Sequence, residues 1–371
     1  MIIGVPKEIK NQEGRVGLTP AGVDVYVKNG HKVYVETGAG IKSGISDDDF
    51  KAAGAGILQS PGDVYGEASM IIKVKEPQPA EYDLLREDQI LYTFLHLAPD
   101  KEQTEALLRN KVAGVAYETV QLSSGVLPLL APMSEVAGRM SIQVGARLLE
   151  ATFSGRGILL AGVTGVEKGN VVILGGGNVG ISAIKMAVGL GADVTVIELS
   201  HARMQYLDDV FGSRIQTLAS NSFNIAKVVK EADLVVGCVL VPGAKAPRLV
   251  SEEMVMSMRP GSVLVDVAID QGGSIDTIDR ITTHDNPYFV KHGVVHYSVA
   301  NMPGAVPRTS TFALTNATLN YGLSIANKGL RQAMLDDPAL LKGLNTYKGK
   351  VTYKSVADDQ GLEYTPAESL L

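Results

Sequence analysis

Short apolar runs alternate with amphipathic or turn-bounded segments along most of the chain. In the first third these runs cover residues 2–5, 32–35, 70–74, 90–94 and 114–117. Helices are predicted between them at 46–53 and 101–109, and at 19–28, where Thr19 precedes a proline at the first helical position. This alternation is typical of βαβ units and predicts a parallel sheet wound on both faces by helices.

The same alternation resumes after a segment rich in Gly, Pro and Ser at about residues 125–135, which we interpret as a hinge. A long helix is predicted from Ser134 to about residue 152, followed by strands at 171–174, 194–197, 214–217, 234–240, 262–267 and 293–299. A helix from 307 to about 327 leads back to the first part. We therefore predict an α/β fold of two doubly wound parallel-sheet (Rossmann-like) domains with a cleft between them, formed by residues 1–128 plus 307–371 and by residues 129–306.

The strand predicted at 171–174 ends in a glycine turn. Gly175, Gly177 and Gly180 have the G-x-G-x-x-G spacing, which suits a tight turn, a close approach of the backbone to a pyrophosphate and close packing of a helix on the strand. The glycines alone do not exclude a plain structural turn. Glu198 closes the next strand, where an acid can accept hydrogen bonds from ribose hydroxyls and repel a 2′-phosphate. This arrangement favours NAD over NADP.

Three titratable or basic residues follow predicted strands of the first domain. Arg15, Lys75 and His96 lie just beyond the runs at 2–5, 70–74 and 90–94. Because ligands of open parallel sheets bind beyond the carboxyl ends of the strands, we expect these side chains on one rim. Taken singly, each has a plain alternative, a surface charge or a half-buried imidazole. Asp270 follows the strand at 262–267, in the half of the second sheet that holds a nicotinamide, unless it only caps the turn at Gly272.

Composition narrows the possible partners. The net charge of −6 and the isoelectric point near 5.6 argue against nucleic acid or an anionic membrane as the main partner. The single cysteine, Cys238, excludes an internal disulfide and fits a reducing cytosol. The first residues form no signal peptide, and no run of the sequence has the length and uniform apolar character of a membrane span. We therefore expect a cytoplasmic enzyme with a small-molecule substrate.

Several motifs together resemble the L-alanine dehydrogenase family over nearly the whole chain. They are Gly-Val-Pro-Lys-Glu at 4–8, Asn-Gln-Glu-Gly-Arg-Val at 11–16, Lys-Val-Lys-Glu-Pro at 73–77, Met-Ser-Glu-Val-Ala-Gly-Arg at 133–139, the glycine turn, Asp-Val-Ala-Ile-Asp-Gln-Gly-Gly at 266–273 and Asn-Met-Pro at 301–303. The resemblance implies a homohexamer of two-domain subunits, with NAD in the cleft. It makes the first domain the substrate and catalytic domain and the second the NAD-binding domain.

The resemblance also implies roles for single residues. It makes Arg15 and Lys75 the substrate-binding pair and His96 and Asp270 the acid–base pair. The positions implied to contact NAD are Ser134, Gly175, Gly177, Gly180, Glu198, Arg203, Ser220, Val239, Leu240, Val267, Ala268, Ile269, Asp270, Arg280, Val299, Ala300, Asn301 and Met302. Glu198 stands where the family commonly has aspartate. Ser324 and Lys328 replace an acid and a histidine that bind a divalent ion in some members, so no metal is expected there.

The implied reaction is the NAD-dependent oxidative deamination of L-alanine to pyruvate and ammonia, and the reverse reductive amination. A guanidinium at Arg15 suits a carboxylate, and an imidazole at His96 titrates near neutral pH. The sequence does not settle which of His96 and Asp270 carries the proton at each step. Three alternatives stay open: the NAD-binding subunit of a proton-translocating transhydrogenase, an opine-type or lysine-forming dehydrogenase, and a non-catalytic NAD-sensing module.

Overall fold

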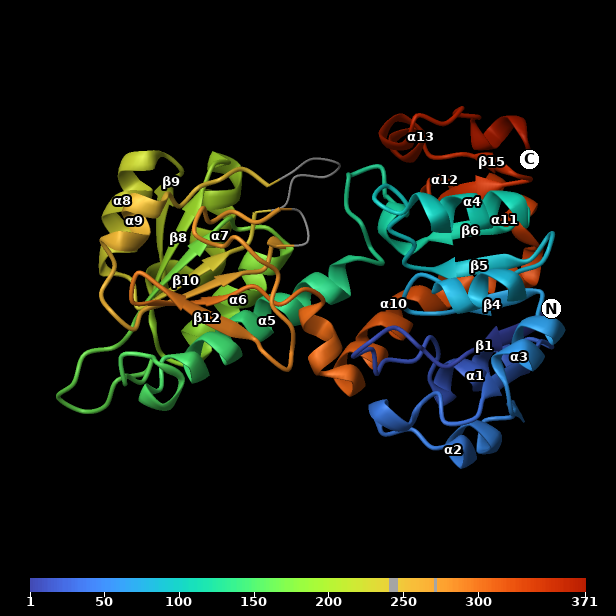
Figure 1. The fold of residues 1–371 in the computed structure, drawn as a ribbon, viewed down its shortest axis with the longest axis horizontal. Coiled ribbons are helices and arrows are strands. Elements are labelled where there is room, and N and C mark those ends of the chain that lie inside the picture. Colours follow the sequence, from blue (N-terminus) through green and yellow to red (C-terminus); the bar gives the residue numbers. More distant parts are fainter. Residues whose placement is uncertain (240–245, 270–271) are drawn as a thin grey trace. The chain divides into compact units, whose positions relative to one another are not determined.

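The computed structural model describes residues 1–239, 246–269 and 272–371. By contacts between residues it divides into two compact units, the first made of Met1–Met133 with Gly304–Leu371 and the second of Ser134–Pro303 (Figure 1). Each unit is an open sheet flanked by helices, so the predicted α/β class with two doubly wound sheets is confirmed. Two residues named above, Leu240 and Asp270, lie outside the described residues.

The sheet of the first unit has six parallel strands in the order β3-β2-β1-β4-β5-β6. They are β1 (Ile2–Val5), β2 (Lys32–Glu36), β3 (Gly56–Leu58), β4 (Met70–Ile72), β5 (Ile90–Thr93) and β6 (Ala113–Ala116). The strand order reverses between β1 and β4, and such a switch point is where open α/β sheets bind ligands. The loops that leave β1, β4 and β5 therefore border the switch point.

The edges of this sheet differ from the sequence prediction. β3 was not predicted, because three half-buried residues that begin with a glycine carry no alternating pattern. The chain's tail also adds β14 (Leu344–Tyr347) and β15 (Lys350–Val351), and β14 runs antiparallel to β6 and to β15. The sheet is therefore mixed rather than purely parallel, and the tail that the sequence placed only loosely forms one of its edges.

Helices of the first unit cover this sheet. α1 begins as predicted, because Thr19 accepts a hydrogen bond from the amide of Gly22 and Pro20 occupies the first position. The helices are α1 (Pro20–Lys28), α2 (Asp47–Ala52), α3 (Pro61–Glu67), α4 (Lys101–Arg109), α10 (Pro307–Lys328), α11 (Leu330–Asp336), α12 (Pro338–Leu341) and α13 (Lys354–Gln360). The tail of the chain thus belongs to the first unit, through α10 in particular.

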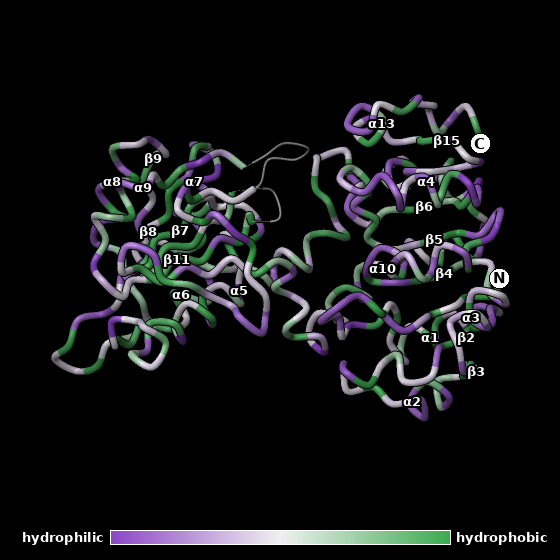
Figure 2. Tube along the Cα trace, viewed as in Figure 1, coloured by the Kyte–Doolittle hydropathy of each residue, from purple (hydrophilic) through white to green (hydrophobic). Residues whose placement is uncertain are grey.

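The second unit repeats the same strand order. Its parallel strands follow the order β9-β8-β7-β10-β11-β13, with β12 antiparallel at the edge. They are β7 (Asn170–Leu174), β8 (Asp193–Glu198), β9 (Gln216–Ala219), β10 (Leu234–Gly237), β11 (Val263–Asp266), β12 (Tyr288–Lys291) and β13 (Val294–Tyr297). The central strands are fully buried, and Figure 2 shows hydrophobic residues concentrated along them. β12 was not predicted, because its residues are only partly buried.

The helices of the second unit are α5 (Ala131–Leu148), α6 (Asn178–Gly189), α7 (His201–Phe211), α8 (Ser222–Glu231) and α9 (Glu252–Met256). α5 begins at Ala131, so Ser134 lies inside the helix rather than opening it. The short 3-10 segments used below are η1 (Ile41–Ser43), η3 (Tyr117–Thr119) and η7 (Met302–Ala305). Across residues 1–239, 246–269 and 272–371, no helix is both long enough and apolar enough to cross a membrane.

Candidate active site

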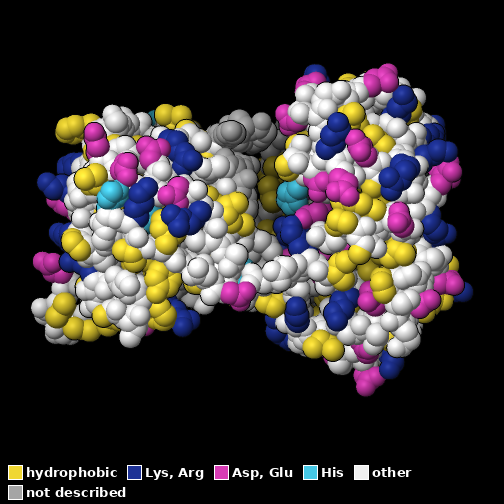
Figure 3. Space-filling model, viewed as in Figure 1, with side chains coloured by type: hydrophobic (Ala, Val, Ile, Leu, Met, Phe, Trp, Pro, Cys, Tyr) yellow, Lys and Arg dark blue, Asp and Glu magenta, His cyan; other side chains and the backbone are white. Residues whose placement is uncertain are grey.

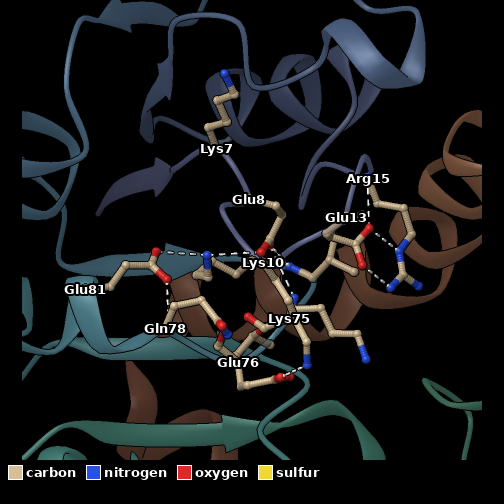
Figure 4. Close-up of polar contacts among 12 residues, drawn as sticks. Lys7, Glu8, Lys10, Glu13, Arg15, Lys75, Glu76, Gln78 and Glu81 are labelled. Atoms are coloured by element: carbon tan, nitrogen blue, oxygen red, sulfur yellow. Dashed lines mark hydrogen bonds and ion pairs between the residues drawn. The ribbon is translucent and has the colours of Figure 1, made fainter. Parts of the chain in front are cut away.

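Arg15 is buried in the loop between β1 and α1, with 2% of its surface exposed. Its Nε donates to Oε1 of Glu13 at 2.7 Å and its Nη2 donates to Oε2 at 2.5 Å, a two-point contact between a guanidinium and a carboxylate. Its Nη1 lies 3.2 Å from the sulfur of Met133. The loop is held by α10, since the amide of Val16 donates to the hydroxyl of Thr311 at 3.1 Å. Arg15 is therefore part of a built, buried site and not a surface charge (Figure 4).

Lys75 lies where the chain leaves β4. Its amide and that of Val74 donate to the same carboxylate oxygen of Glu8, at 3.2 and 2.6 Å. Burial lowers the pKa of Lys75, and the positive charges of Arg15 and Lys10 lower it further against the opposing effect of Glu76. Arg15 and Lys75 are sixty residues apart in the chain, but they lie in the loops that leave two neighbouring parallel strands, β1 and β4, at the same edge, or rim, of the sheet.

Lys73, Glu8 and Glu81 form a buried ion cluster next to this rim. Lys73 is fully buried, and its Nζ lies 3.1 Å from Oε2 of Glu8 and 2.9 Å from Oε1 of Glu81. The hydroxyl of Tyr65 donates to the same oxygen of Glu81 at 2.9 Å. Burial disfavours a charged Lys73, but the two carboxylates outweigh it and raise its pKa. Glu8 thus links the buried cluster to the backbone that carries Lys75.

His96 follows β5 and has a side chain that is 45% exposed. Its backbone is in the left-handed region, with φ of 49°, and its amide donates to Oε1 of Glu118 in η3 at 2.6 Å. The ring stacks on Phe94 at a centroid distance of 5.7 Å. Its Nδ1 lies 3.5 Å from Oε2 of Glu76, whose other oxygen is bound by Lys10. The imidazole is therefore held between a carboxylate and an aromatic ring.

The structure brings Arg15, Lys75 and His96 to the ends of three neighbouring strands, in the order β1-β4-β5. Glu76 connects them, since its carboxylate faces His96 and interacts with Lys75. Sequence reasoning gave no role to four carboxylates that shape this rim: Glu8, Glu13, Glu76 and Glu118. The available signal was acids placed beside the selected cations in the loops after the strands, most clearly in Lys-Glu-Pro at 75–77.

The glycine turn of the second unit has the geometry of a phosphate site. Gly175 has φ of 95°, a conformation that favours glycine. A Cβ on Gly180 would lie 1.9 Å from the carbonyl oxygen of Gly175, so α6 packs directly on the turn. A Cβ on Gly177 would meet no atom of the described residues within 4 Å, its two chain neighbours aside. The turn therefore presents open backbone at the N-terminus of α6, which fits the pyrophosphate of a dinucleotide.

Glu198, at the end of β8, faces this turn. Its Oε2 accepts the amide of Gly176 at 2.7 Å, and its Oε1 accepts the amides of Leu199 and Ser200 at 2.8 and 2.9 Å. Nε of Arg203 donates to the carbonyl of Gly176 at 2.5 Å. Glu198 is thus not a solvated strand-end acid. It ties the turn after β7 to the turn after β8, where an adenosine ribose would bind.

The other predicted NAD contacts follow the same edge of the sheet. Val239 follows β10, Val267 to Ile269 follow β11, and Val299 to Asn301 follow β13, with Met302 opening η7. Ser134 lies on α5, and Ser220 follows β9. Nε of Arg280 donates to Oδ1 of Asp279 at 2.7 Å, and the guanidinium of Arg280 lies over the ring of Phe289. Leu240 and Asp270 fall outside the described residues. The loop after β11 is tied at both ends by the buried Asp266, which accepts the amides of Ala268 at 3.0 Å and Ser274 at 2.6 Å.

The absence of a metal stays a prediction. Ser324 and Lys328 lie on α10, and Nζ of Lys328 pairs with Asp336 at 2.7 Å. Within the described parts of the chain, no group of three or more His, Cys, Asp or Glu side chains is placed to hold an ion.

Comparisons with known proteins agree on one family. The model described as "Alanine dehydrogenase/PNT, N-terminal domain" matches residues 4–137, and "Alanine dehydrogenase/PNT, C-terminal domain" matches residues 141–354. The chain is 64% identical to an alanine dehydrogenase of Methanococcus maripaludis over the full length of both. It is 60% identical to that of Bacillus subtilis, covering 98% of that protein.

Solved structures give the same result. A structure titled "L-alanine dehydrogenase" matches with a TM-score of 0.95 at 53% identity, covering 97% of this chain and 99% of that one. A transhydrogenase from Sinorhizobium meliloti matches with a TM-score of 0.84 at 23% identity, covering 95% of this chain and 100% of that one. The second likeness concerns the fold alone.

Proposed function

The chain belongs to the alanine dehydrogenase/PNT family, and from this premise we propose that it interconverts L-alanine and pyruvate with NAD. In one direction L-alanine and water give pyruvate and ammonia, and the other direction is reductive amination. The observation that carries the proposal is that Arg15, Lys75 and His96 lie in the loops that leave three neighbouring parallel strands, β1, β4 and β5, at one edge of the sheet. A chain that only passes hydride between two nucleotides has no use for such an amino-acid site.

Substrate binding is assigned to Arg15 and Lys75. The substrate carboxylate binds the guanidinium of Arg15, whose plane is fixed by its two bonds to Glu13. Lys75, whose amide is fixed by Glu8, places its ammonium against the keto oxygen of pyruvate and polarises the carbonyl. The buried cluster around Lys73 keeps both groups oriented, which lowers the cost of ordering the site when substrate binds.

The chemistry needs a hydride acceptor and a proton carrier. NAD bound by the second unit would supply the hydride acceptor for Cα of L-alanine. Water then attacks the iminium carbon, and the proton that it loses passes to His96 or Asp270. Of these two, His96 lies within the described residues, with its side chain 45% exposed. The cleft between the units that the sequence predicts stays a prediction.

The fit of NAD rests on the second unit's own residues. The open backbone at Gly177 and the N-terminus of α6 suit the pyrophosphate, and Glu198 beside the turn suits the ribose. The remaining predicted contacts, from Ser134 to Met302, are part of this proposal. A homohexamer and a cytoplasmic location are also proposed; they are supported by the family resemblance and, for the location, by the single cysteine.

The test is direct. Purified protein mixed with NAD and L-alanine should produce NADH, followed by its absorbance, and pyruvate, measured separately. NADP should serve poorly because of Glu198. A screen over glycine, L-serine and 2-aminobutyrate would establish the substrate range. Absence of NADH formation, with NAD binding intact in a calorimetric titration, would favour the non-catalytic NAD-sensing alternative.

A further inference from the structure

We infer that Glu76 is a positioning residue that holds the imidazole of His96 with Nδ1–H toward its carboxylate and presents Nε2 to the substrate. The inference deepens the proposed function and rests on it. It also assigns the proton transfers that the sequence left open between His96 and Asp270. The argument starts from the carboxylate and its surroundings.

Glu76 is a buried carboxylate with two different partners. Its Oε1 is bound by the ammonium of Lys10, while its Oε2 faces Nδ1 of His96 at 3.5 Å. Oε2 is shielded from solvent and makes no hydrogen bond of good geometry among the described residues. A buried carboxylate oxygen is costly without a donor, so the arrangement favours a proton on the nearest ring nitrogen.

Glu76 carries a negative charge in the folded protein. Burial favours its protonated form, but the contact with His96 and the positive charges of Lys75 and Lys10 outweigh burial and hold its pKa well below the usual range. Glu76 is therefore ionised at neutral pH. An anion facing one ring nitrogen fixes the tautomer of a neutral imidazole and stabilises the imidazolium.

The backbone and ring of His96 are held independently of Glu76. The amide of His96 donates to Glu118 at 2.6 Å, and the ring stacks on Phe94 with an interplanar angle of 23°. Glu118 faces the backbone and not the ring nitrogen, whereas Glu76 faces Nδ1. A separation of 3.5 Å is long for a hydrogen bond, and such contacts commonly tighten when substrate binds.

This arrangement gives each proton a carrier. When water attacks the iminium carbon, a C–O bond forms and Nε2 of His96 takes the proton that the water loses, giving a neutral carbinolamine. His96 then returns this proton to the carbinolamine nitrogen and the C–N bond breaks. The hydroxyl proton passes to the released ammonia, so that a carbonyl forms and nitrogen leaves as ammonium. Glu76 stabilises the imidazolium between these two events, and the ring ends neutral.

The test measures the pKa of His96 directly. The rate of carbethoxylation of His96 by diethylpyrocarbonate is followed against pH by mass spectrometry of its peptide, with His31 as an internal reference. Glu76→Gln should move the pH midpoint of this labelling downward, because an anion close to the ring is lost. Lys10→Met should move it upward, because Glu76 is then no longer shared with a cation. Lys75, which also acts on Glu76, is unchanged in both variants.

Glu76→Gln and Lys10→Met are expected to affect the titration of His96 in opposite directions. This difference distinguishes a positioning role of Glu76 from a role in stabilising the fold alone. If Glu76 only anchored the loop through Lys10, both variants would break the same pair and neither would move the pKa of His96. Glu87→Gln and Lys111→Met are the matched controls, since these residues form a surface pair at 2.7 Å. They should leave the pKa unchanged. Thermal unfolding checks the fold, and Lys10→Met, at a side chain 38% exposed, keeps the test available if Glu76→Gln unfolds.

Kinetics complete the test. In Glu76→Gln, kcat should fall about tenfold to a hundredfold with little change in KM for L-alanine, and the acidic limb of the pH profile should move with the pKa of His96. Glu76→Asp, which keeps the charge, should recover part of kcat. An unchanged pKa of His96 in both Glu76→Gln and Lys10→Met would overturn the inference. A fully active His96→Ala would instead overturn the proposed role of His96, whatever the labelling shows.

Discussion

At the scale of single residues, the site is built from cations whose positions are fixed by carboxylates. Arg15 is clamped by Glu13, and the amide of Lys75 is held by Glu8. Both acids are buried. A substitution of Arg15 would therefore remove the proposed substrate contact and also leave the buried Glu13 without its guanidinium partner, whereas Glu8 would keep its backbone donors in a Lys75 variant. The two effects can be separated by experiment.

Arg15→Ala should raise KM for L-alanine and pyruvate about tenfold to a hundredfold, because a charged hydrogen-bonded contact with the carboxylate is lost. It should also lower the free energy of unfolding by several kcal/mol, since Glu13 loses its buried partner. Adding Glu13→Gln should restore stability in urea unfolding but leave KM high. A KM equal to that of the wild type in Arg15→Ala would remove Arg15 from the site.

The pH dependence should report Lys75. Its pKa lies below the usual 10.5, mainly through burial, so its ammonium is lost at a lower pH than that of an exposed lysine. As pH rises through this lowered pKa, kcat/KM for pyruvate at saturating ammonia should fall. Lys75→Arg, which keeps its charge, should show no such fall in the alkaline range. The same alkaline fall in Lys75→Arg would assign it to another group.

The cationic residues of this site could be predicted from the sequence, but the carboxylates that hold them in place could not. Arg15, Lys75 and His96 follow predicted strands, and the rule for parallel sheets then places them together without knowledge of any contact. Glu76 and Glu118 gave no comparable signal, because which carboxylate faces which imidazole depends on loop conformation. His96 itself adopts a left-handed backbone that no spacing predicts.

At the scale of elements, the feature that the sequence predicts most clearly is the turn from β7 into α6. The pattern of three glycines predicted it, and the structure gives different reasons for each glycine. Gly175 needs its positive φ, Gly180 leaves no room for a Cβ, and Gly177 opens to solvent. The first two are demanded by the fold itself. Only Gly177 can be tested as a ligand contact without disturbing the protein.

Gly177→Ala should leave the stability of the protein within about 0.5 kcal/mol, since its Cβ meets no close atom in the part of the chain that the structure describes and its φ of −67° suits alanine. It should weaken NAD binding at least tenfold, because the methyl group occupies space meant for the pyrophosphate. Gly189→Ala, also free of close neighbours and near the end of α6, is the matched control and should bind NAD normally. Isothermal titration and thermal unfolding give both readouts, and normal NAD binding by Gly177→Ala would exclude a pyrophosphate at this turn.

The buried cluster under β4 should dominate the stability of the first unit. Lys73→Met leaves Glu8 and Glu81 buried without their shared cation, which should cost about 3–5 kcal/mol of unfolding free energy. Lys51→Met, which breaks an exposed pair with Asp48, should cost far less, because solvent screens this pair. Because the pKa of Lys73 is raised in the folded protein, its contribution is present below the unfolded pKa and is lost only as pH rises through the folded value. A small cost in urea unfolding would contradict this account.

The sequence predicted the parallel strands of both sheets other than β3. It missed β3, β12, β14 and β15, all of which lie at or next to sheet edges. These strands are short, and β3, β12 and β15 are partly exposed, so their side chains carry neither a continuous apolar run nor a strict alternation. Their pairing is decided by the neighbouring strand. The tail of the chain, for example, pairs with β6, more than two hundred residues away in sequence.

At the scale of the whole molecule, the face drawn in Figure 3 is mixed in charge, with acidic and basic side chains interspersed on both units. One segment stands apart. Between α5 and β7 the chain extends away from the sheet of the second unit (Figure 1), and it exposes Leu159, Val163 and Val166 by 66%, 59% and 63%. Exposed apolar side chains gathered on one projecting segment are typical of a surface that another subunit covers. This observation supports the proposed homohexamer.

The association of subunits can be tested through this segment. Wild-type protein should sediment as an assembly of six 39.2 kDa subunits. Val163→Glu combined with Val166→Glu should lower the assembly mass, since two charges would be buried without partners if the segment lies in an interface. Lys168→Gln, on the same segment but in an exposed pair with Asp193 at 3.8 Å, is the control and should keep the wild-type mass. An unchanged mass in the double variant would place the interface elsewhere, and a wild-type monomer would reject the homohexamer.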